Sequence, residues 1–197
     1  MANLAAVIGR VKGMFKEPEA TLAAHADPAP PWPVALREHA LPLVVGCAAI
    51  SSAVLLLILG FSNVEGAPGL DLVVIQFLLR VVLNLMTIFL FAAVVMVFSG
   101  MFGGASDFSS SYTLVALGLT PMFVAELLAP IPALGIAAAF GGLIYSMIIL
   151  YRGISIVLKV PQQNRAKHFA LTLATLLFLG MILVMAAAPF LLGGVPA

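Results

Sequence analysis

LVVIQFLLRVVLNLMTIFLFAAVVMVF, residues 72–98, is the stretch of sequence that decides the fold. Its 27 residues are apolar except for Gln76, Arg80, Asn84 and Thr87. A helix rises about 1.5 Å per residue, so a helix of this length exceeds the roughly 30 Å thickness of the hydrocarbon layer. The stretch predicts a membrane-spanning helix, because the strands of a membrane barrel alternate in polarity over only about ten residues.

Four further apolar runs of similar kind lie at about residues 41–61, 111–129, 133–158 and 169–191. Of the 197 residues, 63% are hydrophobic and 9% are charged, with a mean hydropathy of +1.19. A soluble domain carries about 45–50% apolar and about 25% charged residues. We therefore predict an all-α, polytopic membrane protein in which residues 41–197 form a bundle of five transmembrane helices.

Residues 1–40 are predicted to form a cytoplasmic or interfacial segment that precedes this transmembrane domain. Within it, residues 4–16 carry apolar side chains at helical spacing, with Arg10, Lys12 and Lys16 on or beside the polar side. This pattern is typical of an amphipathic helix that lies on the membrane surface. A docking helix for a partner protein is the alternative interpretation.

A proline-rich linker is expected at residues 27–33, and the indole of Trp32 within it suits the headgroup zone. The expected membrane-surface contacts are thus Arg10, Lys12, Lys16 and Trp32. Residues 1–40 lack the apolar core of a secretory signal, so we expect no removable signal peptide. The span at 41–61 would then serve as the insertion signal.

The basic residues indicate the orientation of the spans in the membrane. Eight of the nine Lys and Arg lie in the N-terminal segment or in the loop between the fourth and fifth spans: Arg10, Lys12, Lys16, Arg37, Arg152, Lys159, Arg165 and Lys167. The first external loop, residues 63–71, and the tail after Leu191 contain none. Since cytoplasmic loops carry the excess of Lys and Arg, the N-terminus is predicted to be cytoplasmic and the C-terminus external.

The polar residues of the second span are spaced along one side of a helix. Gln76, Arg80 and Asn84 follow one another at intervals of four, with Thr87 three residues further on. An unpaired Arg80 inside the membrane would cost at least about 2.5–3.5 kcal/mol, so a counter-ion is expected. Glu126, near the external end of the third span, is the predicted partner, with Asp71 as the alternative. Two hypotheses follow: a buried pair that fixes helix packing, or a proton or ion pathway.

Other features of the spans predict local structure. Pro121 should kink the third span, and Asp107 or Ser109 should cap its first turn. In the fourth span, small residues recur four apart at 137–141 and 138–142, which allows close approach of a helix from the same chain or from a second subunit.

The remaining reactive side chains indicate no enzyme, metal site or cofactor. Cys47 is the single cysteine, and we interpret it as core packing. His25, His39 and His168 lack the spacing of metal ligands. No catalytic motif is found, so we expect a protein that is not an enzyme. A net charge of +1 excludes nucleic-acid binding as a main activity.

The order of short motifs resembles the Yip1-domain family, in particular its short bacterial members. The matching pieces span about residues 10–190. They are Arg10-Val11-Lys12, Pro18-Glu19-Ala20-Thr21, Leu41-Pro42-Leu43, Phe102-Gly103-Gly104 with Asp107-Phe108, Leu119-Thr120-Pro121, Pro130-Ile131-Pro132-Ala133-Leu134-Gly135, Tyr151-Arg152-Gly153 and Lys159-Val160-Pro161.

The resemblance implies five membrane spans, a cytoplasmic N-terminus, a bacterial inner membrane and a tendency to self-associate. Eukaryotic members act in vesicle trafficking through lipidated small GTPases. This chain lacks their long acidic cytoplasmic region and their Asp-Leu-Tyr-Gly-Pro motif, so GTPase binding is not carried over.

Two functions are predicted from these features. The first is a non-enzymatic membrane protein that organises the lipid bilayer or partner proteins, including a second copy of itself. The second is a small transporter or channel that uses Gln76, Arg80, Asn84 and Glu126.

The orientation can be measured with reporter fusions. A reporter fused after Leu191 should read as external and one inserted at Gln163 as cytoplasmic, because the loop that holds Gln163 carries four basic residues and the tail carries none. A cytoplasmic reading after Leu191 would overturn the five-span arrangement.

Overall fold

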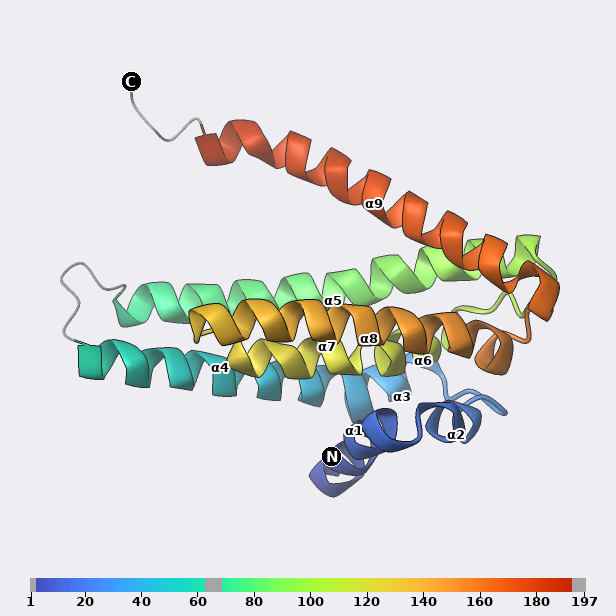
Figure 1. Ribbon diagram of the computed structural model, residues 1–197, viewed down its shortest axis with the longest axis horizontal. Helices are drawn as coiled ribbons and strands as arrows, with labels where there is room; N and C mark the ends of the chain where they lie inside the picture. Colours follow the sequence, from blue (N-terminus) through green and yellow to red (C-terminus); the bar gives the residue numbers. More distant parts are fainter. Residues whose placement is uncertain (1–2, 63–68, 193–197) are drawn as a thin grey trace.

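The computed structural model describes residues 3–62 and 69–192, and this part of the chain is helical with no strand (Figure 1). The elements are α1 (Leu4–Lys16), α2 (Pro18–Ala23), α3 (Trp32–Ala35), the π-helix η1 (Leu36–Ala40), α4 (Leu41–Ser62), α5 (Leu70–Met101), α6 (Phe108–Gly118), α7 (Thr120–Ala125), the 3-10 helix η2 (Glu126–Leu128), α8 (Pro132–Val157) and α9 (Gln162–Leu192). Most of the first external loop, residues 63–68, and residues 193–197 of the predicted external tail lie outside the described residues.

Five helical segments are long and apolar enough to cross a membrane, which confirms the all-α polytopic bundle. They are Trp32–Phe61, Leu70–Met101, Phe108–Leu128, Pro132–Val157 and Gln162–Ile182. The second, third and fourth predicted spans agree with these segments to within three residues at each end. The first segment begins at Trp32 and not at the predicted residue 41, and α9 begins at Gln162 and not at the predicted residue 169.

The predicted extended linker at residues 27–33 is wrong at its C-terminal end. Helix α3 already begins at Trp32 and continues without a break through η1 into α4. Pro33 occupies the first turn of α3, where its missing N–H and fixed φ are compatible with a helix. Residues 27 and 28 lie in a turn with a cis Asp27-Pro28 peptide bond, Pro31 has φ −51° and ψ 138°, and Pro33 lies in the first turn of a helix.

The third span is the central helix of the bundle. Of its most apolar window, 67% is buried, against 11–33% for the other four spans. Every residue from Ser110 to Gly118 is buried. The other spans lie around it and expose large apolar side chains outward, while α9 leans away from α5 and α8 towards its C-terminal end (Figure 1).

The third span is also interrupted, as Pro121 predicts. Helix α6 ends at Gly118 and α7 begins at Thr120, so the break lies at Leu119. A proline at position 121 lacks the N–H that would bond back to residue 117. At the other end of α6, the side chain of Asp107 accepts a hydrogen bond from the Ser110 amide at 2.8 Å, which is the predicted cap.

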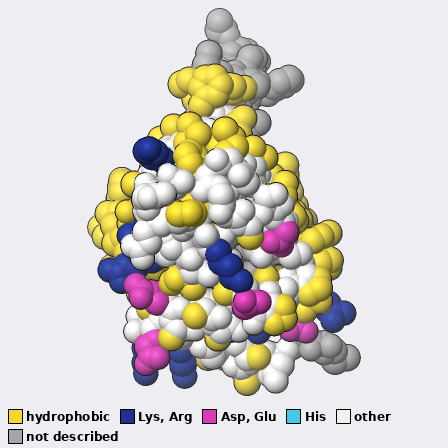
Figure 2. Space-filling model, turned by 90° about the vertical axis from the view of Figure 1, so that its right-hand side faces the viewer, with side chains coloured by type: hydrophobic (Ala, Val, Ile, Leu, Met, Phe, Trp, Pro, Cys, Tyr) yellow, Lys and Arg dark blue, Asp and Glu magenta, His cyan; other side chains and the backbone are white. Residues whose placement is uncertain are grey.

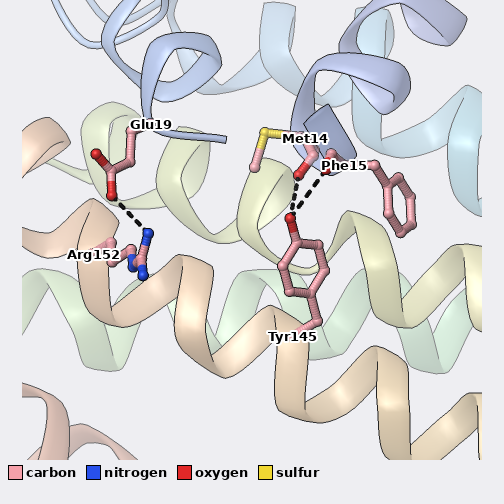
Figure 3. Close-up of polar contacts among 5 residues, drawn as sticks. All are labelled: Met14, Phe15, Glu19, Tyr145 and Arg152. Atoms are coloured by element: carbon pink, nitrogen blue, oxygen red, sulfur yellow. Dashed lines mark hydrogen bonds and ion pairs between the residues drawn. The ribbon is translucent and has the colours of Figure 1, made fainter. Parts of the chain in front are cut away.

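The two N-terminal helices form a hairpin, α1–α2, that packs against the side of the bundle. Met14 and Leu22 are fully buried. The hydroxyl of Tyr145, halfway along α8, donates to the carbonyl oxygens of Met14 and Phe15 at 3.3 Å each (Figure 3). The end of α1 is therefore attached to α8 by both packing and hydrogen bonds.

Two ion pairs connect the hairpin and the turn after it to the C-terminal end of α8. Glu19 lies 3.0 Å from Arg152 (Figure 3), and Asp27 lies 2.9 Å from Lys159. The hydrogen bond and charge of Lys159 lower the pKa of Asp27. All four side chains are exposed, so solvent screens both pairs and they contribute little to the free energy of unfolding. The pairs therefore orient the hairpin, and burial holds it.

Charged side chains are spread over the end of the molecule that carries the α5–α6 and α8–α9 turns (Figure 2). Apolar side chains occupy much of the flanks in the same view. This distribution is the one expected of a helical bundle whose charged end lies outside the hydrocarbon layer.

The small residues of α8 have an intramolecular partner at one of the two predicted positions. A Cβ built on Gly142 would lie 2.7 Å from Ala125 Cβ and 2.9 Å from the Pro121 carbonyl oxygen. A Cβ built on Gly141 meets no atom within 4 Å. The close approach of α8 to α7 therefore depends on Gly142 and not on its neighbour.

This difference gives a matched pair of variants. Gly142→Ala should destabilise the chain by about 1–3 kcal/mol, because backbone atoms of α7 block the added methyl group. At the preceding residue, a Cβ added to Gly141 meets open space. Gly141→Ala should therefore leave the melting temperature in detergent unchanged or slightly raised. Equal shifts for the two variants would contradict the α7–α8 contact.

Candidate functional site

The polar residues of α5 lie at two levels of burial. Asn84 is buried, and Arg80 is half-buried. Gln76 and Thr87 are exposed on the outside of the bundle, and the Thr87 hydroxyl donates to the Leu83 carbonyl at 2.9 Å within its own helix. Only the middle two of the four predicted residues thus point to interior neighbours.

The carboxylate of Glu126 is bound by Asn84. The Nδ2 of Asn84 lies 2.9 Å from Oε1 and 3.0 Å from Oε2, so the side-chain amide donates to both carboxylate oxygens. Glu126 is the first residue of η2, at the end of the third span. The contact therefore joins α5 to the C-terminal end of the central helix.

Arg80 makes a different contact, and the predicted direct ion pair between Arg80 and Glu126 is wrong. Its Nη1 donates to the hydroxyl of Ser51 on α4 at 2.8 Å. No nitrogen of Arg80 comes within 4.0 Å of a Glu126 oxygen; among the residues described, ion pairs form only at Arg152–Glu19 and Lys159–Asp27. Asp71, the alternative counter-ion, makes no such pair with Arg80 either.

The error came from the assumed height of the third span. Helix α5 has 32 residues, whereas Phe108–Leu128 has 21. The shorter helix ends more than two turns before the N-terminal end of α5, so Glu126 comes level with Asn84 and not with Arg80.

A cavity of about 260 Å³ has Glu126 in its wall. The rest of the wall consists of small and apolar side chains of the third span and α8, among them Ala125 and Gly135. Glu126 thus contacts an amide donor on α5 and borders an accessible space beside α8. Chemically, this arrangement can hold a proton or an ion at the carboxylate, or it can simply satisfy a polar contact between helices.

Of the predicted membrane-surface residues on α1, two are exposed and one is directed towards the protein. Lys12 and Lys16 are exposed on α1. Arg10 is half-buried and donates to the backbone carbonyl of Glu38. Burial lowers the pKa of Arg10, and the charge of Glu38 opposes that shift. Arg10 is therefore directed towards the protein, whereas the two lysines are available to the surroundings.

Trp32 packs against aromatic side chains instead of standing alone in the headgroup zone. Its ring lies 5.4 Å from Phe89, 6.1 Å from Phe108 and 6.3 Å from Tyr112, measured between centroids. The backbone amide of Trp32 also donates to the Ser109 hydroxyl at 3.2 Å. These contacts join the start of α3 to α5 and α6, and Trp32 keeps 37% of its surface exposed.

Two partners were missed by the sequence analysis. Ser51 follows Cys47 by four residues on one face of α4, and both are buried, so a small polar group among interior positions was the available signal. His25 and His39 were treated as separate, yet they line one cavity together with Arg10. Positions 10, 25 and 39 follow no helical or strand repeat, so the spacing of these residues in the sequence could not have predicted that they meet.

Among the residues with described positions, no three His, Cys, Asp or Glu are arranged to hold a metal ion.

Comparison with known families matches the Yip1 domain over residues 12–187. The chain belongs to the Yip1 domain family. No curated protein and no solved structure gives a significant match. The Yip1 domain covers α1 from its middle, all five spans and the Asn84–Glu126 contact. The N-terminal hairpin and the membrane bundle are thus parts of one family domain.

The contact between Asn84 and Glu126 can be measured by a double-mutant cycle. Asn84→Leu should leave the half-buried carboxylate without its donor and Glu126→Leu should leave the buried amide unpaired, each costing about 1–3 kcal/mol in thermal unfolding in detergent. The double variant should recover a coupling energy of about 0.5–3 kcal/mol.

The matched cycle uses Arg80→Leu with Glu126→Leu. These two residues share no hydrogen bond, so their losses should be closer to additive. A larger coupling for Arg80 than for Asn84 would restore the ion pair predicted from the sequence and contradict the observed geometry.

Proposed function

We propose that this Yip1-domain chain is a non-enzymatic protein of a bacterial inner membrane that organises the bilayer surface or partner membrane proteins. Its N-terminus would be cytoplasmic and its C-terminus periplasmic, as the distribution of Lys and Arg favours. A second copy of the chain is among the partners we propose. No cofactor is required for this role.

The observation that carries the proposal is the division of the apolar side of α1. Val7 and Met14 are buried against the bundle, while Leu4, Ile8 and Phe15 remain 67%, 45% and 46% exposed. Positions 4, 8 and 15 share one stripe of the helix, which lies next to the buried one. The apolar side is therefore wider than the contact with the bundle requires.

The lysines of α1 adjoin the exposed stripe. Lys12 follows Ile8 by four residues and Lys16 follows Lys12 by four, so both lie at its edge and both are exposed. An exposed apolar stripe bordered by lysines is typical of a helix that rests at an anionic membrane surface, where each cation adds about 1 kcal/mol of attraction. We infer that α1 is an amphipathic, interfacial helix that the bundle holds in place.

A specific observation also favours the second function, a small transporter. The 260 Å³ cavity reaches Glu126, an ionisable group inside the membrane. Against it, the hydrogen bonds of Asn84 to Glu126 and of Arg80 to Ser51 satisfy these groups within the protein. A contact of this kind supports an architectural role, in which polar side chains fix how helices pack.

Complementation can separate the two functions. In a strain that lacks the chain, a triple variant with Leu4, Ile8 and Phe15 replaced by Ser should accumulate in the membrane at the normal level but fail to restore the deletion phenotype. Leu4 and Ile8 contribute little to the core because they are exposed, whereas the Phe15 ring, 46% exposed, also stacks on Tyr145 at 5.9 Å between centroids, so the level of the variant in the membrane is measured alongside. The Asn84→Leu, Glu126→Leu double variant should still complement.

The reverse result would assign the function to the intramembrane polar residues. A second measurement tests the transporter function directly. The rate of proton flux into proteoliposomes that contain the natural chain or Glu126→Gln should equal the rate into empty vesicles. A flux that depends on Glu126 would overturn the organising role.

A further inference from the structure

A second cavity, of about 220 Å³, lies where the N-terminal hairpin meets η1 and α6. Its polar lining consists of Arg10, His25, Glu38, His39 and Thr113. Apolar side chains from α3 and α6 form the rest of the wall. The polar residues come from four separate segments of the chain, so the cavity exists only in the folded protein.

Three polar atoms of these lining residues are themselves enclosed, each with less than 1 Å² of exposed surface, and have no hydrogen-bond partner among the described residues. They are Nε of Arg10, Nδ1 of His39 and Oγ1 of Thr113. His39 is 3% exposed and Thr113 is 2% exposed. Buried polar groups are nearly always hydrogen-bonded, so three such atoms around one cavity indicate that something polar binds there.

The hydrogen bond at Nε2 of His39 determines which of the two ring nitrogens carries the proton. Nε2 lies 3.1 Å from the Thr120 hydroxyl, and that hydroxyl donates its own proton to the Ala116 carbonyl at 3.3 Å. The Thr120 oxygen must therefore accept, and Nε2 of His39 carries the proton. In the neutral ring, Nδ1 is left as an acceptor.

The lining holds one cation, Arg10, and one carboxylate, Glu38, whose charge acts on Arg10. Nδ1 of His25 donates to the Thr21 carbonyl at 2.8 Å, which leaves its Nε2 as a further acceptor. Glu38 is exposed, and its backbone carbonyl takes one N–H of Arg10. The cavity thus offers a fixed cation with a free N–H, a hydroxyl, and imidazole acceptors.

We propose that this cavity binds an anionic glycerophosphate group, the chemistry of a phosphatidylglycerol headgroup. The phosphate would accept hydrogen bonds from Arg10 Nε and the Thr113 hydroxyl, as phosphates do from Arg. A glycerol hydroxyl would donate to Nδ1 of His39. The volume has room for about seven water-sized groups, which suits a headgroup and excludes a whole lipid.

The source of the ligand is a lipid and not a dissolved metabolite. This part of the inference rests on the proposed function, because it uses the interfacial position of α1, whose exposed stripe of Leu4, Ile8 and Phe15 places Arg10 at headgroup depth. The apolar part of the wall then faces the glycerol backbone and the start of the acyl chains.

The full chain in detergent is first exchanged into equal amounts of phosphatidylglycerol and phosphatidylcholine. Native mass spectrometry then measures which of the two lipids remains bound. The natural chain should retain one phosphatidylglycerol in preference. Arg10→Gln should reduce this occupancy about tenfold and Thr113→Val about fivefold. Thr113→Val removes a hydroxyl that no protein group uses, so its melting temperature should not fall.

Lys12→Gln is the matched control, since it removes an equal charge from the exposed side of the same helix. Occupancy should then stay within about twofold of the natural chain. Equal losses for Arg10→Gln and Lys12→Gln would mean that general surface attraction binds the lipid, and would overturn the cavity site while leaving α1 at the membrane surface. No preference for phosphatidylglycerol in the natural chain would also overturn it.

A further arm adds sn-glycerol 3-phosphate to the chain with bound lipid. Persistence of the phosphatidylglycerol adduct supports a lipid ligand. Displacement at low millimolar concentration, lost in Arg10→Gln but kept in Lys12→Gln, would show a site for a dissolved phosphate ester and would overturn the lipid source without touching the organising role.

Discussion

No water is available inside the hydrocarbon layer to satisfy a polar side chain, and this constraint determines how α5 meets its neighbours. The helix carries an arginine and an asparagine on one face, and each needs a partner from the protein. Arg80 obtains the Ser51 hydroxyl of α4, and Asn84 obtains the carboxylate of Glu126. The two contacts lie one helical turn apart and bind α5 to two different spans, so the positions of α4 and of the central helix along α5 follow from them.

The sequence was sufficient to predict the spans, since each is a continuous apolar run whose length a bilayer requires. It was also sufficient for local features with a short-range cause, such as the Asp107 cap and the interruption before Pro121. It failed where the outcome depended on relative height. The assumption that antiparallel spans end together paired Glu126 with Arg80, whereas the short third span brought it to Asn84.

The N-terminal segment shows a different reason for failure. Helical spacing predicted the bounds of α1 correctly, at Leu4 and Lys16. Periodicity reveals an apolar side but not how much of it the protein covers. The structure divides that side between the bundle and the exterior, and it turns Arg10 inward to a cavity shared with two histidines from later in the chain. Residues that meet only through tertiary packing leave no trace in local spacing.

The unequal lengths of the spans have a consequence for the surrounding bilayer. Helix α5 extends about 48 Å at 1.5 Å per residue and the central helix about 31 Å, against a hydrocarbon thickness of roughly 30 Å. The α7–α8 turn therefore ends short of the tip of α5, and because the third span is enclosed by the other helices, lipids meet the long wall of α5 and not the shorter central helix. A helix that is longer than the hydrocarbon layer is accommodated by tilting, by kinking or by local thickening of the bilayer, so the length of α5 requires one of these adjustments from the helix or from the lipids around it.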